Sequence, residues 1–325
     1  MAKFLVTGGA GFIGSNLVQA LLDNGDTVRV LDNLATGQKA NIEPFLGKID
    51  FQQADLTDLK ACRKAADSMD YILHHGAIPS VPRSVDDPLK TNAANITGTL
   101  NLLLAARDAK TKRLVYAASS SAYGDSPVMP KVETMETRPK SPYAIQKLAG
   151  ELYCQNFSAL YGLETVILRY FNVFGPRQDP CSVYSAVIPL FIKAIGQDTP
   201  PVIFGDGLTS RDFTYVDNNV QANLLACAAP PAAAGQIINI ACGYEISLNQ
   251  LVAKINKYFG KNITARYAAE RAGDVKHSLA DISKAEKLLG YKPLVSFDAG
   301  LAKTIEFYAR ASLAASVQGS PSGSL

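Results

Sequence analysis

The sequence contains few cysteines, no long apolar stretch and no block of like charges. Its five cysteines are odd in number and irregularly spaced, which favours neither a disulfide framework nor a zinc site. We therefore expect no bound metal and five free thiols, at Cys62, Cys154, Cys181, Cys227 and Cys242.

The charge and hydropathy patterns restrict the partners of the chain. A formal net charge of +3, with acidic and basic residues interspersed, provides no electrostatic surface for nucleic acid or for an anionic membrane. Every apolar stretch is well below the roughly 18 residues needed to cross a bilayer, and Met1 leads directly into a core-like strand, which leaves no room for a signal peptide. We expect a small-molecule partner, no membrane association and a cytoplasmic location.

The 325 residues, 47% of them hydrophobic, can bury one large core or two smaller ones. In the first half, short β-branched stretches alternate with longer amphipathic ones, which is the pattern of parallel βαβ units. The short strands are almost continuously apolar, so the sheet should be covered on both faces. We expect strands at 3–7, 27–31, 49–53, 71–74, 113–117, 165–169 and 237–241, and helices at 13–24, 60–66, 92–109, 143–161, 188–195 and 218–228.

The alternation of strands and helices breaks after the stretch at 165–169, where Gly, Pro and Asp become frequent. We predict an α/β fold with a doubly wound parallel sheet over residues 1–175 and a smaller, mixed α/β domain mainly over 176–315. Segments at about 210–245 should cross back to the first domain. The tail at 316–325, rich in Ser and Gly, should be flexible.

Three glycines, Gly8, Gly11 and Gly14, follow the first predicted strand and open the helix that begins near Phe12. Glycines allow a tight turn and a close approach of the backbone, and the helix N-terminus offers unpaired N–H groups to a pyrophosphate. The spacing differs from the usual Gly-x-Gly-x-x-Gly, and an ordinary glycine turn is the alternative. In its βαβ setting, the motif predicts a Rossmann-type dinucleotide site.

Two acids follow predicted strands on the same edge of the sheet. Asp32 lies about 20 residues after the glycines, where a carboxylate accepts hydrogen bonds from the adenosine ribose, although a solvated turn acid is the alternative. Asn33 follows it and no arginine is adjacent, which favours NAD over NADP. Asp55 and Leu56 could contact the adenine, but Asp55 could equally cap the next helix.

Tyr143 and Lys147 are one helical turn apart and therefore lie on the same helix face. An ammonium group near a phenol lowers the phenol pKa from about 10, so that Tyr143 could act as a general base towards an alcohol. Such pairs are also common on ordinary amphipathic helices. The run Ser119, Ser120 and Ser121, directly after the strand at 113–117, could supply a hydroxyl beside Tyr143 or could serve a turn.

Four segments together resemble extended short-chain dehydrogenases that modify sugar nucleotides: residues 7–14, 119–124, 141–147 and 168–175. The resemblance runs from residue 3 to about residue 310. It is closest to bacterial UDP-N-acetylglucosamine 4-epimerases, through the segments 175–180 and 273–281. It implies NAD binding by the first domain, UDP-sugar binding by the second, and a homodimer formed through the helices at 92–109 and 143–161.

The resemblance also implies roles for individual residues. Tyr143 would be the base, Lys147 would tune it and hold the nicotinamide ribose, and Ser120 would bind the substrate alcohol. Ser119 and Ser121 remain alternatives to Ser120, because this loop varies in length among relatives. The implied cofactor contacts are Gly8, Gly11, Phe12, Ile13, Gly14, Asp32, Asn33, Asp55, Leu56, His75, Gly76, Ala77, Asn95, Ser119, Tyr143, Lys147, Tyr170 and Phe171.

On the substrate side, Arg211 and Arg271 are similar to paired arginines that hold the UDP diphosphate, since guanidinium forks match phosphates; two solvated surface arginines are the alternative. Ser278 stands where epimerases restricted to UDP-glucose carry Tyr, and its small side chain would leave space for an acetamido group. The other implied substrate contacts are Ser121, Asn172, Ala186, Val187, Val202, Phe204 and Asp274.

We therefore predict NAD-dependent 4-epimerisation of a UDP-hexose through a 4-keto intermediate, with UDP-GlcNAc and UDP-GalNAc as substrates and UDP-Glc and UDP-Gal as further ones. The alternatives are a UDP-glucuronate 4-epimerase, a decarboxylase, a sugar-nucleotide 4,6-dehydratase and an NAD-binding module without catalysis. Dehydratase relatives carry Asp-Glu after the catalytic hydroxyl, whereas this chain has Ser121 and Ala122 there. A module without catalysis is disfavoured because Ser120, Tyr143 and Lys147 are all present.

Overall fold

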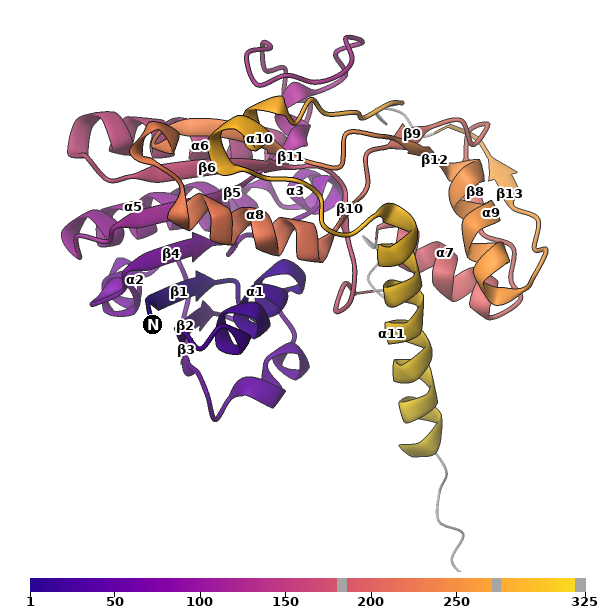
Figure 1. Cartoon of the computed structure of the whole chain (residues 1–325), viewed down its shortest axis with the longest axis horizontal. Helices are drawn as coiled ribbons and strands as arrows, with labels where there is room; N and C mark the ends of the chain where they lie inside the picture. Colours follow the sequence, from indigo (N-terminus) through magenta and orange to yellow (C-terminus); the bar gives the residue numbers. More distant parts are fainter. Residues whose placement is uncertain (180–185, 271–275, 319–325) are drawn as a thin grey trace, which may run out of the picture.

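The computed structural model describes residues 1–179, 186–270 and 276–318. A seven-stranded parallel sheet forms its first part, with the order β11-β6-β5-β4-β1-β2-β3 (Figure 1). From β1, the chain builds one half of the sheet outwards and then returns to build the other half, so the strand order reverses between β1 and β4. The strands are β1 (Lys3–Thr7), β2 (Thr27–Asp32), β3 (Asp50–Gln53), β4 (Tyr71–His74), β5 (Arg113–Ser119), β6 (Thr165–Tyr170) and β11 (Gln236–Ile240).

Helices cover both faces of this sheet, as its apolar strands require. Adjacent strand residues point to opposite faces, so that Val6 belongs to one core and Leu5 to the other. The first core includes residues of α1 (Phe12–Asp23), α8 (Val216–Ala228) and α10 (Ser283–Leu289), and the second core includes residues of α2 (Leu59–Ala66), α5 (Gly98–Asp108) and α6 (Pro142–Tyr161). The predicted α/β fold with a doubly wound parallel sheet is confirmed.

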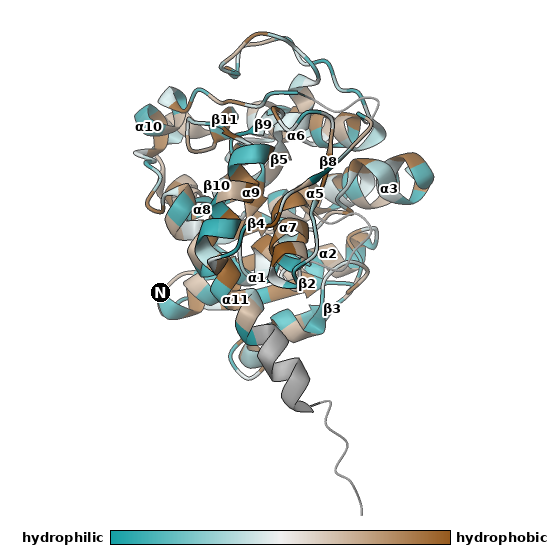
Figure 2. Cartoon of the chain, turned by 90° about the vertical axis from the view of Figure 1, so that its right-hand side faces the viewer, coloured by the Kyte–Doolittle hydropathy of each residue, from teal (hydrophilic) through white to brown (hydrophobic). Residues whose placement is uncertain are grey.

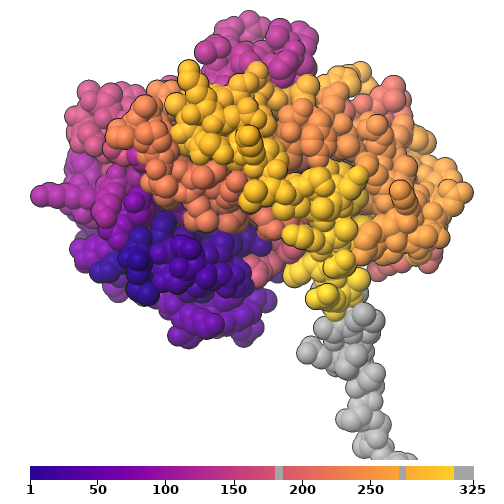
Figure 3. Space-filling model, viewed as in Figure 1, coloured from indigo at the N-terminus to yellow at the C-terminus, as the bar shows by residue number. Residues whose placement is uncertain are grey.

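A smaller part with its own apolar core lies beside the sheet, on the right-hand side of Figures 1 and 3. The apolar helix α7, brown in Figure 2, packs against α9 and contributes to this core. Its helices are α7 (Val187–Gly196), α9 (Leu248–Phe259) and α11 (Phe297–Gln318), and its short strands are β8 (Val202–Phe204), β9 (Ser210–Arg211), β12 (Ile246–Ser247) and β13 (Arg266–Ala268). Further short strands, β7 (Val173–Phe174) and β10 (Thr214–Tyr215), pair where the two parts meet.

The structure differs from the sequence prediction in several elements. The helix predicted at 92–109 is divided by a π-helical turn, Ala93–Thr97, between α4 (Pro88–Asn92) and α5. The short helix α3 (Val81–Asp86) and the elements after β11 were not predicted. Helix α11 continues to Gln318, three residues into the predicted flexible tail, because the alanine-rich sequence before it favours helix; the rest of that tail lies outside the described residues.

The described residues include four of the five cysteines, and all four are free thiols; Cys181 lies outside them. Within the described ranges, no cluster of three His, Cys, Asp or Glu side chains is arranged to hold a metal ion. In those same ranges no helix combines the length and apolarity that crossing a membrane requires.

A buried ion pair fixes α6 to the sheet. Arg169 of β6 and Glu151 of α6 are 1% and 0% exposed and share two hydrogen bonds of 2.8 and 2.6 Å. The guanidinium also lies over the ring of Tyr123, 4.6 Å from its centre. Because each buried charge is neutralised mainly by the other, the pair holds in place the helix that carries Tyr143 and Lys147.

We expect Arg169→Met to lower the free energy of unfolding by about 3–5 kcal/mol, because Glu151 would remain as an unpaired buried charge. Urea denaturation followed by circular dichroism would measure this loss. Arg138→Met is a matched control, since Arg138 pairs with Glu136 on the surface, and it should cost less than about 1 kcal/mol. Equal losses for the two variants would contradict a special role for the buried pair.

Candidate active site

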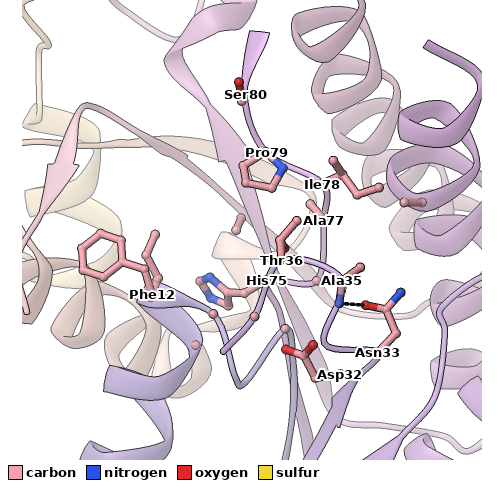
Figure 4. A pocket seen from close by; sticks show the side chains of 18 of the residues that line it. Phe12, Asp32, Asn33, Ala35, Thr36, His75, Ala77, Ile78, Pro79 and Ser80 are labelled. Atoms are coloured by element: carbon pink, nitrogen blue, oxygen red, sulfur yellow. Dashed lines mark hydrogen bonds between the residues drawn. The ribbon is translucent and has the colours of Figure 1, made fainter. Parts of the chain in front are cut away.

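A cavity of about 410 Å³ lies beside the carboxyl ends of β1, β2, β4 and β5, where the strand order reverses. This is the crevice in which doubly wound sheets bind ligands. Figure 4 shows Phe12, Asp32, Asn33 and His75 around it. The structure brings most of the predicted cofactor residues to its lining: Gly8, Gly11, Phe12, Ile13, Gly14, Asp32, Asn33, Asp55, Leu56, His75, Gly76, Ala77, Tyr143, Lys147 and Tyr170.

The glycine loop is packed too closely for larger residues. Gly8 has φ +68°, and a Cβ on it would lie 2.8 Å from the Cα of Gly76. A Cβ on Gly14 would lie 2.1 Å from the carbonyl oxygen of Gly8. Gly11 caps α1 without any side-chain hydrogen bond, so the first N–H groups of this helix are left for a ligand.

Asp32 and Asn33 lie at the end of β2, on the rim of the same cavity. Asp32 is 7% exposed and accepts hydrogen bonds from the backbone N–H groups of Ala10 and Leu34, at 2.9 and 2.8 Å. Burial raises the pKa of Asp32, against these two hydrogen bonds, which lower it. Asn33 donates to Asp55 at 2.6 Å and accepts from the N–H of Ala35, the bond drawn in Figure 4.

Of the three serines left open by the sequence, the structure places Ser119 beside Tyr143. Strand β5 continues through Ser119, two residues further than predicted, and a 3₁₀ turn (Ser120–Tyr123) follows it. As a result, Ser119 is the serine whose hydroxyl acts on Tyr143, and it lowers the pKa of that phenol. The Ser119 hydroxyl also accepts from the N–H of Ser121 at 3.2 Å, while the Ser121 hydroxyl is buried without a partner among the described residues.

The expected lowering of the Tyr143 pKa by Lys147 is not found. Burial raises the pKa of Tyr143, and the nearby Ser119 hydroxyl lowers it. The ammonium group of Lys147 instead donates to the carbonyl oxygen of Ala117 at 2.8 Å and lies 5.0 Å from the ring centre of Tyr116. Burial lowers the pKa of Lys147 to about 8.

Three predicted cofactor residues are not part of the lining: Ser119, at the end of β5, and Asn95 and Phe171, which lie behind the cavity. Asn95, in the π-helical turn, exchanges two hydrogen bonds with the backbone of Ile78 at 2.8 and 3.0 Å and donates to Gln146 at 2.8 Å. It therefore holds the lining segment after β4 against α6. Phe171 is fully buried against Tyr123, because the chain after β6 turns into the core there.

Several predicted substrate residues meet where the chain after β6 approaches β9. Asn172, with φ +30°, donates to the carbonyl oxygen of Asp212 at 3.2 Å and to the hydroxyl of Ser278 at 3.4 Å. Arg211 donates to the carbonyl oxygen of Lys276 at 3.1 Å. Ala186 lines the cavity and Val187 begins α7, while Val202 and Phe204 belong to β8. Arg271 and Asp274 lie outside the described residues.

Sequence reasoning missed part of the lining. The segment 35–38 and Asn41 follow β2. Because they come shortly after Asp32, they could have been predicted as lining residues from the sequence. Arg177, Gln178 and Asp179 lie in the 175–180 motif, which carried the resemblance but received no role. The other lining residues that were missed are Leu31, Ala54, Ile78, Pro79, Ser80, Arg83, Ala94, Ala117 and Ala118.

Comparison with known proteins identifies the family of this fold and cavity. The model of the NAD dependent epimerase/dehydratase family matches residues 4–241. The chain belongs to this family. NAD is therefore the cofactor of this epimerase/dehydratase, and the cavity fits it: a glycine-rich loop lies at the free N-terminus of α1, with the Asp32 carboxylate at one end.

Similar proteins cover almost the whole chain. A UDP-glucose 4-epimerase of Mycolicibacterium smegmatis is 38% identical over 310 residues, which are 94% of this chain and 98% of that protein. The solved UDP-N-acetylglucosamine 4-epimerase of Methanobrevibacter ruminantium M1, in complex with UDP-N-acetylmuramic acid, is 41% identical, with a TM-score of 0.91 and coverage of 95% and 99%. The UDP-glucuronic acid 4-epimerase of Bacillus cereus, with UDP-glucuronic acid and NAD, is 34% identical, with a TM-score of 0.88 and coverage of 95% and 99%.

We expect Gly14→Ala to weaken NAD binding roughly ten- to a hundredfold, because the new Cβ would displace the backbone of Gly8. Titration of NAD into the NAD-free protein by isothermal calorimetry would measure this. Gly47→Ala is the matched control, since a Cβ on Gly47 meets nothing within 4 Å, and its effect should stay within about twofold. Unchanged affinity in Gly14→Ala would contradict the assignment of this loop to the cofactor.

Proposed function

We propose that the chain is a UDP-sugar 4-epimerase. The observation that carries the proposal is the group Ser119, Tyr143 and Lys147, assembled at the end of β5 beside the cofactor cavity. This group can move a proton from a substrate alcohol next to a hydride acceptor. The whole-length likeness to three proteins named as UDP-sugar 4-epimerases supports the same reaction.

In the proposed reaction, Tyr143 takes the proton of the sugar 4-hydroxyl, and Ser119 holds the same oxygen by a hydrogen bond. NAD, when bound, supplies the hydride acceptor for carbon 4 and returns that hydride later. Its positively charged ring also favours the Tyr143 phenolate, whose formation burial opposes. After the 4-keto sugar has turned over, Tyr143 gives the proton back and the opposite epimer forms.

Alternative reactions within the family differ in the residues that they need. With Ser119 as the hydroxyl, Ser120 and Ser121 occupy the two positions at which a 4,6-dehydratase would carry Asp-Glu. Elimination of water would have no carboxyl group there to act as acid and base. A UDP-glucuronate 4-epimerase is the second candidate, because the Bacillus cereus enzyme named for that activity is similar over nearly the whole chain.

For the sugar itself, we propose that N-acetylated UDP-hexoses are accepted. Ser278 is small, half-buried and within hydrogen-bond distance of Asn172. Space left by a short side chain at this position would accommodate an acetamido group. The likeness to a UDP-N-acetylglucosamine 4-epimerase supports this choice.

We also propose a homodimer. Helix α6 exposes Ile145, Leu152 and Leu160, which are 53%, 52% and 71% exposed. Ile145 and Leu152 are seven residues apart and lie on one face, which supports the helix pairing expected from the resemblance. A cytoplasmic location remains a prediction from the sequence.

Turnover without added NAD, on UDP-N-acetylglucosamine, UDP-glucose and UDP-glucuronate side by side, tests the proposed reaction. We expect epimerisation of the first two sugars. Ser278→Tyr should lower kcat/KM for the acetylated sugar roughly ten- to a hundredfold, because the ring would fill the space for the acetamido group, and should spare UDP-glucose. Turnover of UDP-glucuronate alone would support the second candidate, and equal losses on both hexoses would remove Ser278 as the specificity residue.

Serine variants test the position of the catalytic hydroxyl. We expect Ser119→Ala to lower kcat about a hundredfold and Ser120→Ala to change it no more than about twofold. Ser119 lowers the pKa of Tyr143, so its removal should also move the rising limb of the pH–rate profile to higher pH. Tyr143→Phe, the positive control, should abolish turnover. A larger loss of kcat in Ser120→Ala than in Ser119→Ala would instead assign the catalytic hydroxyl to Ser120.

A further inference from the structure

Arg177 lies in the loop after β7, and its side chain reaches back to the first helix. Its Nη1 donates to the carbonyl oxygen of Ser15 at 2.9 Å, and its guanidinium carbon lies 5.5 Å from the ring centre of Phe45. The backbone φ of Arg177 is +68°, a left-handed conformation that residues other than glycine rarely adopt. Such strain is typical of functional positions, because the surrounding structure must impose it.

The charge of Arg177 has no anionic partner among the residues that the structure describes. The side chain is half-buried, and its one hydrogen bond to those residues is the bond to Ser15, a neutral acceptor. Burial lowers the pKa of this guanidinium without any neighbouring acid that opposes the shift. A partly desolvated cation gains more from an anion than from a neutral acceptor, so Arg177 is suited to an anionic ligand.

The place of Arg177 in the cavity indicates which anion it can reach. Along the described lining, the cations are Arg83, Lys147 and Arg177. Lys147 is held next to Ala117 and Tyr116, below the catalytic tyrosine. Arg177 lies at the first turn of α1, whose free N–H groups and positive dipole end attract a diphosphate. A guanidinium there can add a second, charge-assisted contact to the same anion.

The loop that carries Arg177 is fixed to both parts of the molecule. Asn16 of α1 donates to the carbonyl oxygen of Pro176 at 3.2 Å, and the Tyr308 hydroxyl of α11 donates to the carbonyl oxygen of Gln178. Asn41, which also lines the cavity, donates to the carbonyl oxygen of Ala10 and so fixes the segment after β2 to the glycine loop. Arg177, Gln178 and Asp179 of this anchored loop line the cavity.

We propose that Arg177 binds the diphosphate of NAD and retains the cofactor between turnovers. This inference rests on the proposed function, because a 4-epimerase returns its hydride in each cycle and gains nothing by releasing the cofactor. Binding of the diphosphate also explains why Arg177 is charged, why its backbone is strained and why its loop is anchored. Arg177 becomes a further cofactor-binding residue, within the motif at 175–180 that had received no role.

The test measures binding without any turnover. Arg177→Met should be purified with less NAD per subunit, and its Kd for NAD should rise about ten- to a hundredfold, as for loss of a charge-assisted hydrogen bond. The dependence of this Kd on salt should become weaker, and Arg177→Lys should retain part of the affinity. The Kd for UDP should change no more than about twofold.

Tyr308→Phe is the control for the loop, since it removes an anchor and keeps the charge; its Kd for NAD should stay within about twofold of the native value. Equal losses of NAD affinity in Tyr308→Phe and Arg177→Met, with unchanged salt dependence, would mean that Arg177 only stabilises the loop. That result would overturn the proposal. A rise in the Kd for UDP but not for NAD would assign Arg177 to the substrate and overturn it as well. Failure of epimerase turnover alone would leave these binding results unaffected.

Discussion

The contact between the glycine loop and the end of β4 is the constraint on which the site depends. The backbones of Gly8 and Gly76 approach so closely that a Cβ on Gly8 would clash with the backbone of Gly76. The Thr7 hydroxyl accepts from the N–H of Gly76 at 3.1 Å and is hydrogen bonded to His74 at 2.8 Å, and His74 is in turn bonded to Thr99 of α5 at 3.0 Å. Burial keeps the pKa of His74 well below its ordinary value, so the neutral ring can bond through both of its nitrogens.

This network connects the cofactor cavity to the helices that carry the chemistry. Thr99 donates to the backbone of Asn95, and Asn95 holds both Ile78 and Gln146. The wall of the cavity and helix α6 are therefore positioned through one set of hydrogen bonds. The buried pair of Arg169 and Glu151 fixes the same helix one turn further along. The position of Tyr143 thus depends on groups such as Asn95, Glu151 and Arg169, which are not among the residues that line the cavity.

Much of this arrangement could be predicted from the sequence, and the reasons are local. The fold follows from apolar strands and from glycines spaced around a helix start, and the shared helix of Tyr143 and Lys147 follows from their spacing. The reactive serine could not be identified in this way, because a run of three serines does not indicate where β5 ends. The pKa shift of Tyr143 could not be predicted from the sequence either, because it depends on burial and on the direction in which Lys147 points. Arg177 was missed because its role depends on a left-handed turn that places it against a distant helix.

The π-helical turn at Ala93–Thr97 also limits how this protein can change. A π turn is in effect one extra residue within a helix, and it sets the rotational phase between α4 and α5. Deletion of that residue would rotate α5 by about 100° about its axis and take Leu102 and Leu103 away from the sheet. Surface loops of related proteins are free to gain and lose residues, but this segment has to keep its length for as long as the site is used.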